Sequence, residues 1–201
     1  RTKLVIGFSA VITFALVISA TAFYGLNLLQ SNTQKMYDKD LIGISLLRSL
    51  NRDLNVIGRY VNRVILEVDA GNEVAAKKDI EKIAKVKSEL LANYEKSKST
   101  IIRPELVVKI NEVGSTINEV MLAVDNVTST ALSKGGASAA YKIIDSKEYR
   151  DLYDKLSNEI KEISSVKIEG AAKNMEAASA AAERMEWLIT ILLIVSLVLS
   201  L

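Results

Sequence analysis

The stretch RSLNRDLNVIGRYVNR, residues 48–63, combines two patterns within one amphipathic segment. Its apolar residues recur at the alternating three- and four-residue spacing of a helical heptad. The series extends beyond the stretch on both sides, and its members are Leu47, Leu50, Leu54, Ile57, Val61, Val64 and Val68. This pattern predicts an α-helix that packs one stripe of its surface against other helices of the same kind.

The second pattern is a set of four arginines on another side of this helix: Arg48, Arg52, Arg59 and Arg63. An α-helix turns by about 100° per residue, so these arginines fall within a sector of roughly 60°. Like charges at this spacing repel each other, and Asp53 is the only acid between Asp40 and Glu67. The stripe is either a solvated face or an anion-binding surface, because guanidinium groups bind carboxylates in bidentate geometry.

Three further amphipathic segments follow, separated by short polar connections. Gly71 and Asn72, within DAGNE (69–73), are turn formers that end the first helix. A second helix is expected until the polar KSKST (96–100), and Pro104 suits the first turn of a third. After the flexible SKGGAS (133–138), a fourth helix is expected from about Ala139, with no proline to interrupt it before Trp187.

Four amphipathic helices with short connections predict an all-α fold, an antiparallel up-down-up-down four-helix bundle. The heptad period favours crossing angles near 20° with left-handed supercoiling. Cysteine and histidine are absent, which excludes Cys/His zinc sites, haem ligation by His or Cys, thiol chemistry and histidine-based triads. We therefore expect no cofactor, no metal and no enzymatic activity. The net charge of +2 gives no indication of a nucleic-acid partner.

Both ends of the chain are apolar. The run LVIGFSAVITFALVISATAFYGL (4–26) is long enough to span a bilayer, and no charge follows until Lys35. Arg1 and Lys3 place the N-terminus in the cytoplasm by the positive-inside rule. The alternative is a cleavable signal peptide ending near Ala20-Thr21-Ala22. The continuation of the run beyond that point favours an uncleaved anchor.

The C-terminal run WLITILLIVSLVLSL (187–201) is short for a complete span. The chain begins without Met and ends within this run, so we interpret it as a fragment cut inside a second transmembrane helix. The predicted organisation is a cytoplasmic stub and first transmembrane helix (1–29), a sensory bundle (30–186), and the truncated start of a second transmembrane helix (187–201). The bundle would then lie outside the cytoplasm, with a bacterial periplasm as the simplest compartment.

Helix lengths place part of the fourth helix beside the arginine stripe. Arg63 is 33 residues after Gln30, and Tyr153 is 33 residues before Glu186, so both stand roughly 50 Å above the expected membrane surface at about 1.5 Å per residue. The segment KEYRDLYDKL (147–156) therefore brings Tyr149, Arg150 and Tyr153 to the level of Arg59 and Arg63. Together they predict a pocket for a small carboxylate, although Tyr149 suits core packing better.

This organisation resembles bacterial methyl-accepting chemotaxis proteins, and the bundle resembles the ligand-binding domain of the aspartate and serine receptor type. The resemblance is carried by LNRDLNVIGRYVNR (50–63) and EYRDLYDKL (148–156). It implies a receptor in the bacterial inner membrane, a homodimer through the first bundle helix, and kinase-coupling partners in the cytoplasm reached through a C-terminal part that the chain lacks. The ligand-binding positions it implies are Arg52, Arg59, Arg63, Arg150 and Tyr153, with Tyr149 as a further candidate.

Two alternatives stay open at this point. Sensor histidine kinases can carry the same kind of ectodomain, and a bundle of this kind can bind a periplasmic protein instead of a small ligand. The identity of the ligand, and whether it attracts or repels, is equally open. For a small-ligand receptor, the alanine-rich GAAKNMEAASAAAERMEW (170–187) favours transmission through the fourth helix, because small side chains let helices slide past each other.

Overall fold

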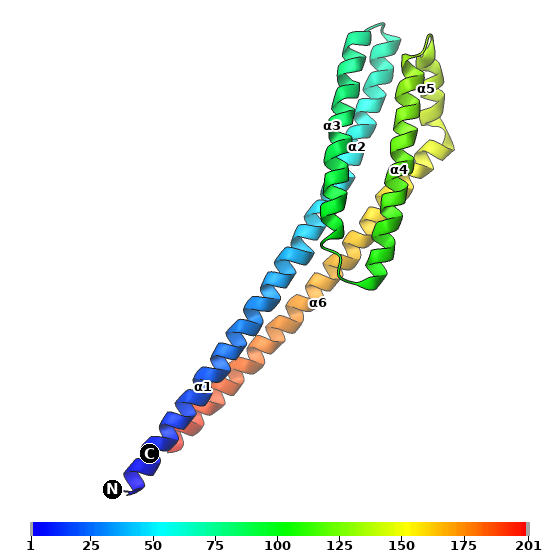
Figure 1. Cartoon of the computed structure of the whole chain (residues 1–201). Helices are drawn as coiled ribbons and strands as arrows, with labels where there is room; N and C mark the ends of the chain where they lie inside the picture. Colours follow the sequence, from blue (N-terminus) through cyan, green and yellow to red (C-terminus); the bar gives the residue numbers. More distant parts are fainter. Residues whose placement is uncertain (1, 200–201) are drawn as a thin grey trace. The chain divides into compact units, whose positions relative to one another are not determined.

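The computed structural model describes residues 2–199, which form helices without any strand (Figure 1). The prediction of an all-α fold is confirmed. Two compact units divide the chain: one is Lys39–Ile168, and the other combines the segment up to Asp38 with the segment from Glu169 onward. The elements are α1 (Thr2–Lys35), the π-helix η1 (Met36–Leu41), α2 (Ile42–Asp69), α3 (Glu73–Lys98), α4 (Pro104–Leu132), α5 (Gly136–Asp145) and α6 (Lys147–Leu199).

The unit Lys39–Ile168 is a bundle around one hydrophobic core. Within it, α2 and α3 lie side by side, as do α4 and α5, and each of α2, α3, α4 and α5 runs opposite to the one before it, while α6 continues in the general direction of α5 (Figure 1). The heptad stripe of α2 is buried, with at most 2 % of each side chain exposed, at Leu47, Leu50, Leu54, Ile57, Val61 and Val64. The stripe of α4 is buried likewise at Leu106, Ile110, Val113, Ile117, Val120, Val124 and Val127. The heptad prediction for α2 is therefore confirmed from Leu47 to Val64, while Val68 is half-buried, and α6 adds Leu156, Ile160 and Ile163 to this core.

The connections follow the turn residues. Gly71 adopts a φ of +74°, which a residue with a side chain rarely does, and the side chain of Asn72 accepts a hydrogen bond from the Ala75 backbone as the cap of α3. Pro104 stands in the first turn of α4, as expected. Residues 96–98, expected in a loop, are instead helical, and the connection between α3 and α4 is limited to residues 99–103.

The expectation of an unbroken fourth helix from about Ala139 is wrong, because Ser146 separates α5 from α6. Its backbone is extended, with ψ of 149°. The Ser146 N–H donates to the Ile143 carbonyl at 3.1 Å, and its Oγ accepts from the Tyr149 N–H at 3.2 Å. Ser146 therefore ends one helix and caps the next. A serine followed by an acid in the first turn, here Glu148, is the sequence signal for such a start.

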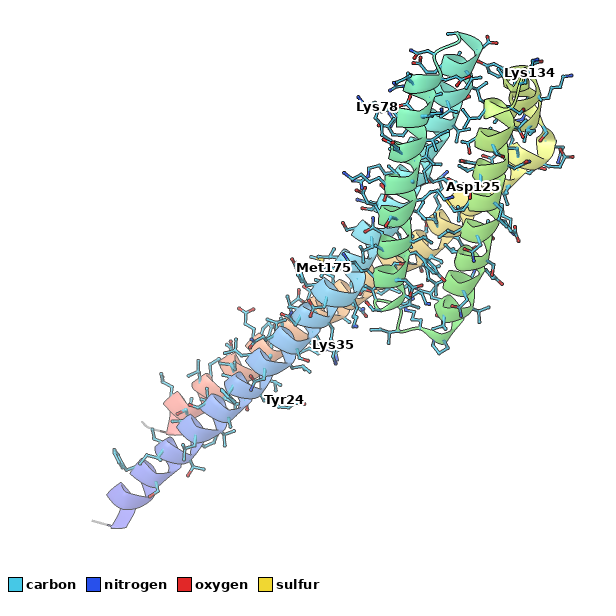
Figure 2. The ribbon with its side chains drawn as sticks, turned by 45° about the horizontal axis from the view of Figure 1, so that its top comes forward. Tyr24, Lys35, Lys78, Asp125, Lys134 and Met175 are labelled. Carbon is cyan, nitrogen blue, oxygen red and sulfur yellow. The ribbon has the colours of Figure 1, made fainter. Side chains whose placement is uncertain are left out.

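The other unit pairs α1 with the second part of α6. Gly25 leaves room for a side chain of α6, since a Cβ at this position would lie 1.6 Å from the Met185 sulfur. Tyr24 and Met175 are exposed on their helices (Figure 2). Within the described residues, one helix, Val11–Asp69, has the length and composition to cross a membrane, with a mean hydropathy of 1.8 in its most apolar window.

Some sequence predictions concern positions that are not described. Arg1, Ser200 and Leu201 lie outside the described residues, and so does the side chain of Lys3. The two transmembrane assignments and the boundaries at residues 29 and 186 stay predictions. Helical continuity is nevertheless observed: α1, η1 and α2 follow each other without a non-helical residue, and α6 runs from Lys147 to Leu199.

Candidate functional site

The arginine stripe borders a depression on the surface of α2. A cavity of about 270 Å³ is lined by Val56, Arg59, Tyr60 and Arg63. These positions follow the i, i+3, i+4, i+7 spacing, so a single helix presents them on one face. The two arginines are exposed, while Val56 and Tyr60 are half-buried. The depression thus has an apolar floor and a cationic rim.

Arg63 shares a carboxylate that the sequence analysis did not anticipate. Its Nε lies 3.1 Å from Oδ2 of Asp79 on α3, and Lys82 Nζ lies 2.8 Å from Oδ1 of the same group. Both cations also lie over the Tyr60 ring, at 5.8 and 5.3 Å from its centroid. An acid from a neighbouring helix, absent from the local sequence of the stripe, therefore offsets the charge of Arg63. One buried carboxylate nevertheless faces two cations, so the cluster retains excess positive charge.

Arg52 is paired with a buried carboxylate of its own helix. Its Nε and Nη2 donate to Oδ1 of the buried Asp53 at 3.0 and 2.9 Å. The other oxygen of Asp53 accepts from Asn93 of α3 at 3.0 Å, so the carboxylate is satisfied on both sides. Arg48 and Arg59, by contrast, form no ion pair with any residue in the described range 2–199. Of these two, Arg59 alone lines the depression.

The upper part of α6 meets α2 at a glycine next to Arg59. A Cβ at Gly58 would lie 3.6 Å from Cε1 of Tyr153, so the Tyr153 ring packs against the bare backbone of α2. The rings of Tyr149 and Tyr153 lie 4.9 Å apart, tilted by 33°. Tyr153 therefore contacts α2 at the residue that precedes Arg59, and its place in a binding pocket stays a prediction. The contact occurs at the level of Arg59, with Arg63 one helical turn further along.

Both phenol oxygens are buried, and neither has a partner at normal hydrogen-bond distance within the described part of the chain, although the two hydroxyls interact with each other. Burial raises the pKa of the Tyr149 and Tyr153 hydroxyls, and the neighbouring phenol raises the pKa of Tyr153 further. Both side chains also pack against the hydrophobic core. The core-packing interpretation of Tyr149 thus agrees with the structure, but its unpaired hydroxyl goes beyond packing, because buried polar groups are normally hydrogen-bonded.

Arg150 is engaged elsewhere. It is exposed, and its Nη2 donates to the Asp145 carbonyl at 2.7 Å, across the break between α5 and α6. A cation at this place offsets the negative end of the α5 dipole. The depression on α2 is lined without Arg150. The structure thus places Arg59 and Arg63 at the depression, whereas Tyr153 contacts α2 at Gly58 outside this lining, and Arg52 and Arg150 have local partners.

Sequence reasoning missed three contributors to this region: Gly58, Asp79 and Asn93. A glycine inside a heptad helix costs about 1 kcal/mol relative to alanine, and it indicates close approach of another element. Gly58 therefore carried a usable signal. Asp79 and Asn93 carried none, because their partners lie on another helix at positions that only the packing of α3 on α2 defines.

Comparison with known proteins identifies the family of the chain. Residues 1–182 match a protein-family model described as "Four helix bundle sensory module for signal transduction". Searches of curated proteins and of solved structures gave no match. The matched region includes α2, α3, α4, α5 and most of α6, and therefore every residue discussed above. The chain belongs to the family of four-helix-bundle sensory modules for signal transduction, the sensory modules of chemoreceptors.

Proposed function

We propose that the chain is the sensory module of a transmembrane chemoreceptor that binds a small organic acid or amino acid. The binding surface is the region of Arg59, Arg63 and Tyr153, with Arg52, Tyr149 and Arg150 at its edges. The observation that supports it best is the depression lined by Arg59 and Arg63, with the buried phenol of Tyr153 packed on Gly58, the residue before Arg59. A carboxylate accepts hydrogen bonds from both kinds of group.

Electrostatics favour an anion here. Arg59 has no ion-pair partner in the described chain, and Arg63 shares Asp79 with Lys82. An anion in the depression would therefore lower the free energy of a surface that is otherwise self-repelling. Because a guanidinium is planar and forms two parallel hydrogen bonds, it favours carboxylates over spherical anions.

The phenols favour a ligand with hydrogen-bonding groups. A buried hydroxyl without a partner costs about 1–3 kcal/mol of stability. Tyr149 and Tyr153 both carry such a hydroxyl. A small rearrangement of α6 that exposes these oxygens to a bound carboxylate or amino acid would recover this free energy. Ligand binding and a change in the position of α6 would then be linked.

The outer face of α2 also suits contact with a second copy. Val56 is half-buried within one chain, and the exposed Leu66 lies on the same face as Arg59 and Arg63. Two such faces related by a two-fold axis would place both arginine sets around one anion. We infer a homodimer through α2, anchored by α1 in a bacterial inner membrane. The bundle lies in the periplasm and transmits the signal through α6.

A thermal-shift screen of the chain against organic acids and amino acids tests the proposal. A ligand that binds only the folded state raises the unfolding midpoint according to its concentration and affinity. We expect a saturable increase for at least one carboxylate and none for the matching uncharged amide. If every acid leaves the midpoint unchanged, the arginine stripe is a solvated face, and a protein-binding role becomes the better explanation.

A further inference from the structure

A buried lysine joins three separate segments at one end of the bundle unit. Lys167 of α6 is only 4 % exposed. Its ammonium donates to the Lys39 carbonyl in η1 and to the Thr100 carbonyl between α3 and α4, each at 3.0 Å. The Asp40 carboxylate stands 3.8 Å away. One cation therefore links α6, the π-helix and the connection between α3 and α4.

The surroundings are shaped around this side chain. A Cβ at Gly43 would lie 2.7 Å from Lys167 Cε and 2.5 Å from the Thr100 hydroxyl oxygen, so only a glycine of α2 leaves space for the lysine stem. Lys39 adds a second tie, because its own ammonium donates to the Ser99 carbonyl at 2.9 Å. The end of α3 is thus held by two lysines from two different elements.

Burial of an ammonium group costs free energy unless hydrogen bonds and an opposite charge compensate for the lost hydration. Burial lowers the pKa of Lys167, which the Asp40 carboxylate partly offsets. An apolar side chain would fill the same space without this cost, but it would not bind the two backbone carbonyls. The specific effect of the lysine is therefore to hold η1 and residues 99–100 against α6.

The contacts of Lys167 lie at the limits of the bundle unit. Lys39 and Ile168 are the first and last residues of the bundle unit, so the cluster lies at the two points where the chain enters and leaves it. At the entry point the helix has π geometry, which is common at functional sites and at hinges. A shift of α6 against α2 within the bundle therefore reaches the Lys167–Lys39 bond before it reaches the chain outside the unit.

We propose that Lys167 is a conformational latch that makes η1, the connection between α3 and α4, and the adjoining turn of α6 open and close as one unit. Closed, the latch resists movement of α6 against α2. Open, it releases both helices at the base of the bundle. Its role in transmission rests on the sensory function proposed above, whereas the latch itself does not depend on a ligand.

Amide hydrogen exchange of the whole chain in lipid nanodiscs tests the latch without ligand. The variant is Lys167→Met, which keeps the length of the stem and removes the ammonium. The matched control is Lys161→Met, an exposed lysine of the same helix with no ion pair among the described residues. We expect exchange in residues 36–44 and 97–103 to accelerate at least tenfold and by a common factor in Lys167→Met, because one opening exposes both segments. Residues 54–64 and 113–124 should keep their rates, and Lys161→Met should change none of them.

A second variant perturbs the same contact from α2. Gly43→Ala retains the lysine but places a methyl group where its stem lies, so the same two segments should accelerate together. Unchanged exchange in 36–44 for both variants would overturn the proposal. Acceleration by unrelated factors in the two segments would also overturn it, and so would uniform acceleration throughout the bundle, which would make Lys167 an ordinary contributor to global stability.

Discussion

Tyr153 of α6 packs against Gly58 of α2, where a Cβ would lie 3.6 Å from the phenol ring. This contact sets the Tyr153 ring, whose hydroxyl is buried, against the residue that precedes Arg59 in the sequence. It connects the helix that carries the arginine stripe with the helix proposed to transmit the signal.

Arg59 and Arg63 should contribute directly to ligand affinity. Loss of one charge-assisted bidentate pair costs roughly 1.5–3 kcal/mol, so Arg59→Ala and Arg63→Ala should each weaken a carboxylate ligand at least tenfold. Isothermal titration calorimetry measures the change. Arg48→Ala is the matched control, because Arg48 is exposed on the same stripe but does not line the depression. If Arg59→Ala and Arg63→Ala bind the ligand as tightly as the parent chain and as Arg48→Ala, the stripe does not bind the ligand.

Tyr153→Phe should separate stability from binding. Removal of an unpartnered buried hydroxyl should raise the free energy of unfolding by about 1 kcal/mol in the ligand-free chain. The same variant should bind a carboxylate ligand more weakly, because a hydrogen-bond donor is lost. Thermal unfolding with and without ligand measures both effects. A destabilised variant with unchanged affinity would indicate that the hydroxyl serves the fold rather than the ligand.

The buried tyrosines should make the bundle sensitive to alkaline pH. Burial raises the pKa of Tyr149 and Tyr153 above the value of about 10 expected in the unfolded chain. Above that pH the unfolded state loses protons that the folded state keeps, so the free energy of unfolding falls as pH rises, by up to about 1.4 kcal/mol per pH unit for each phenol.

The test is urea unfolding at pH 9 and at pH 11. The double variant Tyr149→Phe/Tyr153→Phe should lose much of the decline seen in the parent chain. Lys167 changes the free energy of unfolding in the opposite direction. Because its pKa is lowered in the folded chain, stability rises with pH up to about 10.5. Both chains contain Lys167, so it cancels in the comparison. An identical decline in both chains would rule out the tyrosines as its source.

Arg52 should matter for stability more than the other arginines of the stripe. Arg52→Ala leaves the buried carboxylate of Asp53 with Asn93 as its remaining side-chain partner. Loss of one partner of a fully buried pair costs about 3–5 kcal/mol, but the Arg52 side chain is 66 % exposed, so we expect about 1–2 kcal/mol. Arg48→Ala should change the free energy of unfolding by less than about 0.5 kcal/mol. Chemical denaturation distinguishes the two, and equal effects would contradict the structural role of Arg52.

Dimerisation should depend on ligand. The stripe repels its own copy across a two-fold axis until an anion neutralises it, so the chain should form a weak homodimer that a carboxylate tightens. Sedimentation in density-matched detergent measures the dissociation constant with and without ligand. A chain that stays monomeric at saturating ligand would remove α2 as the dimer face.

Part of this protein is determined by local pattern alone. Burial of an apolar stripe depends on residue spacing within one helix, so the heptad of α2 predicted its buried face directly. The turn at Gly71 and the helix start at Pro104 follow from backbone preferences of single residues. The all-α class and the outward placement of the arginines were predictable for the same reason.

The partners of the charged and polar groups were decided only by the tertiary structure. Arg63 meets Asp79, and Lys167 meets the carbonyls of Lys39 and Thr100, because helices pack at one particular register. A pattern within one helix defines which face is buried, but it contains no information about which residue of another helix stands opposite. That choice comes from the packing of all helices together, and it decides which arginines remain free to bind an anion.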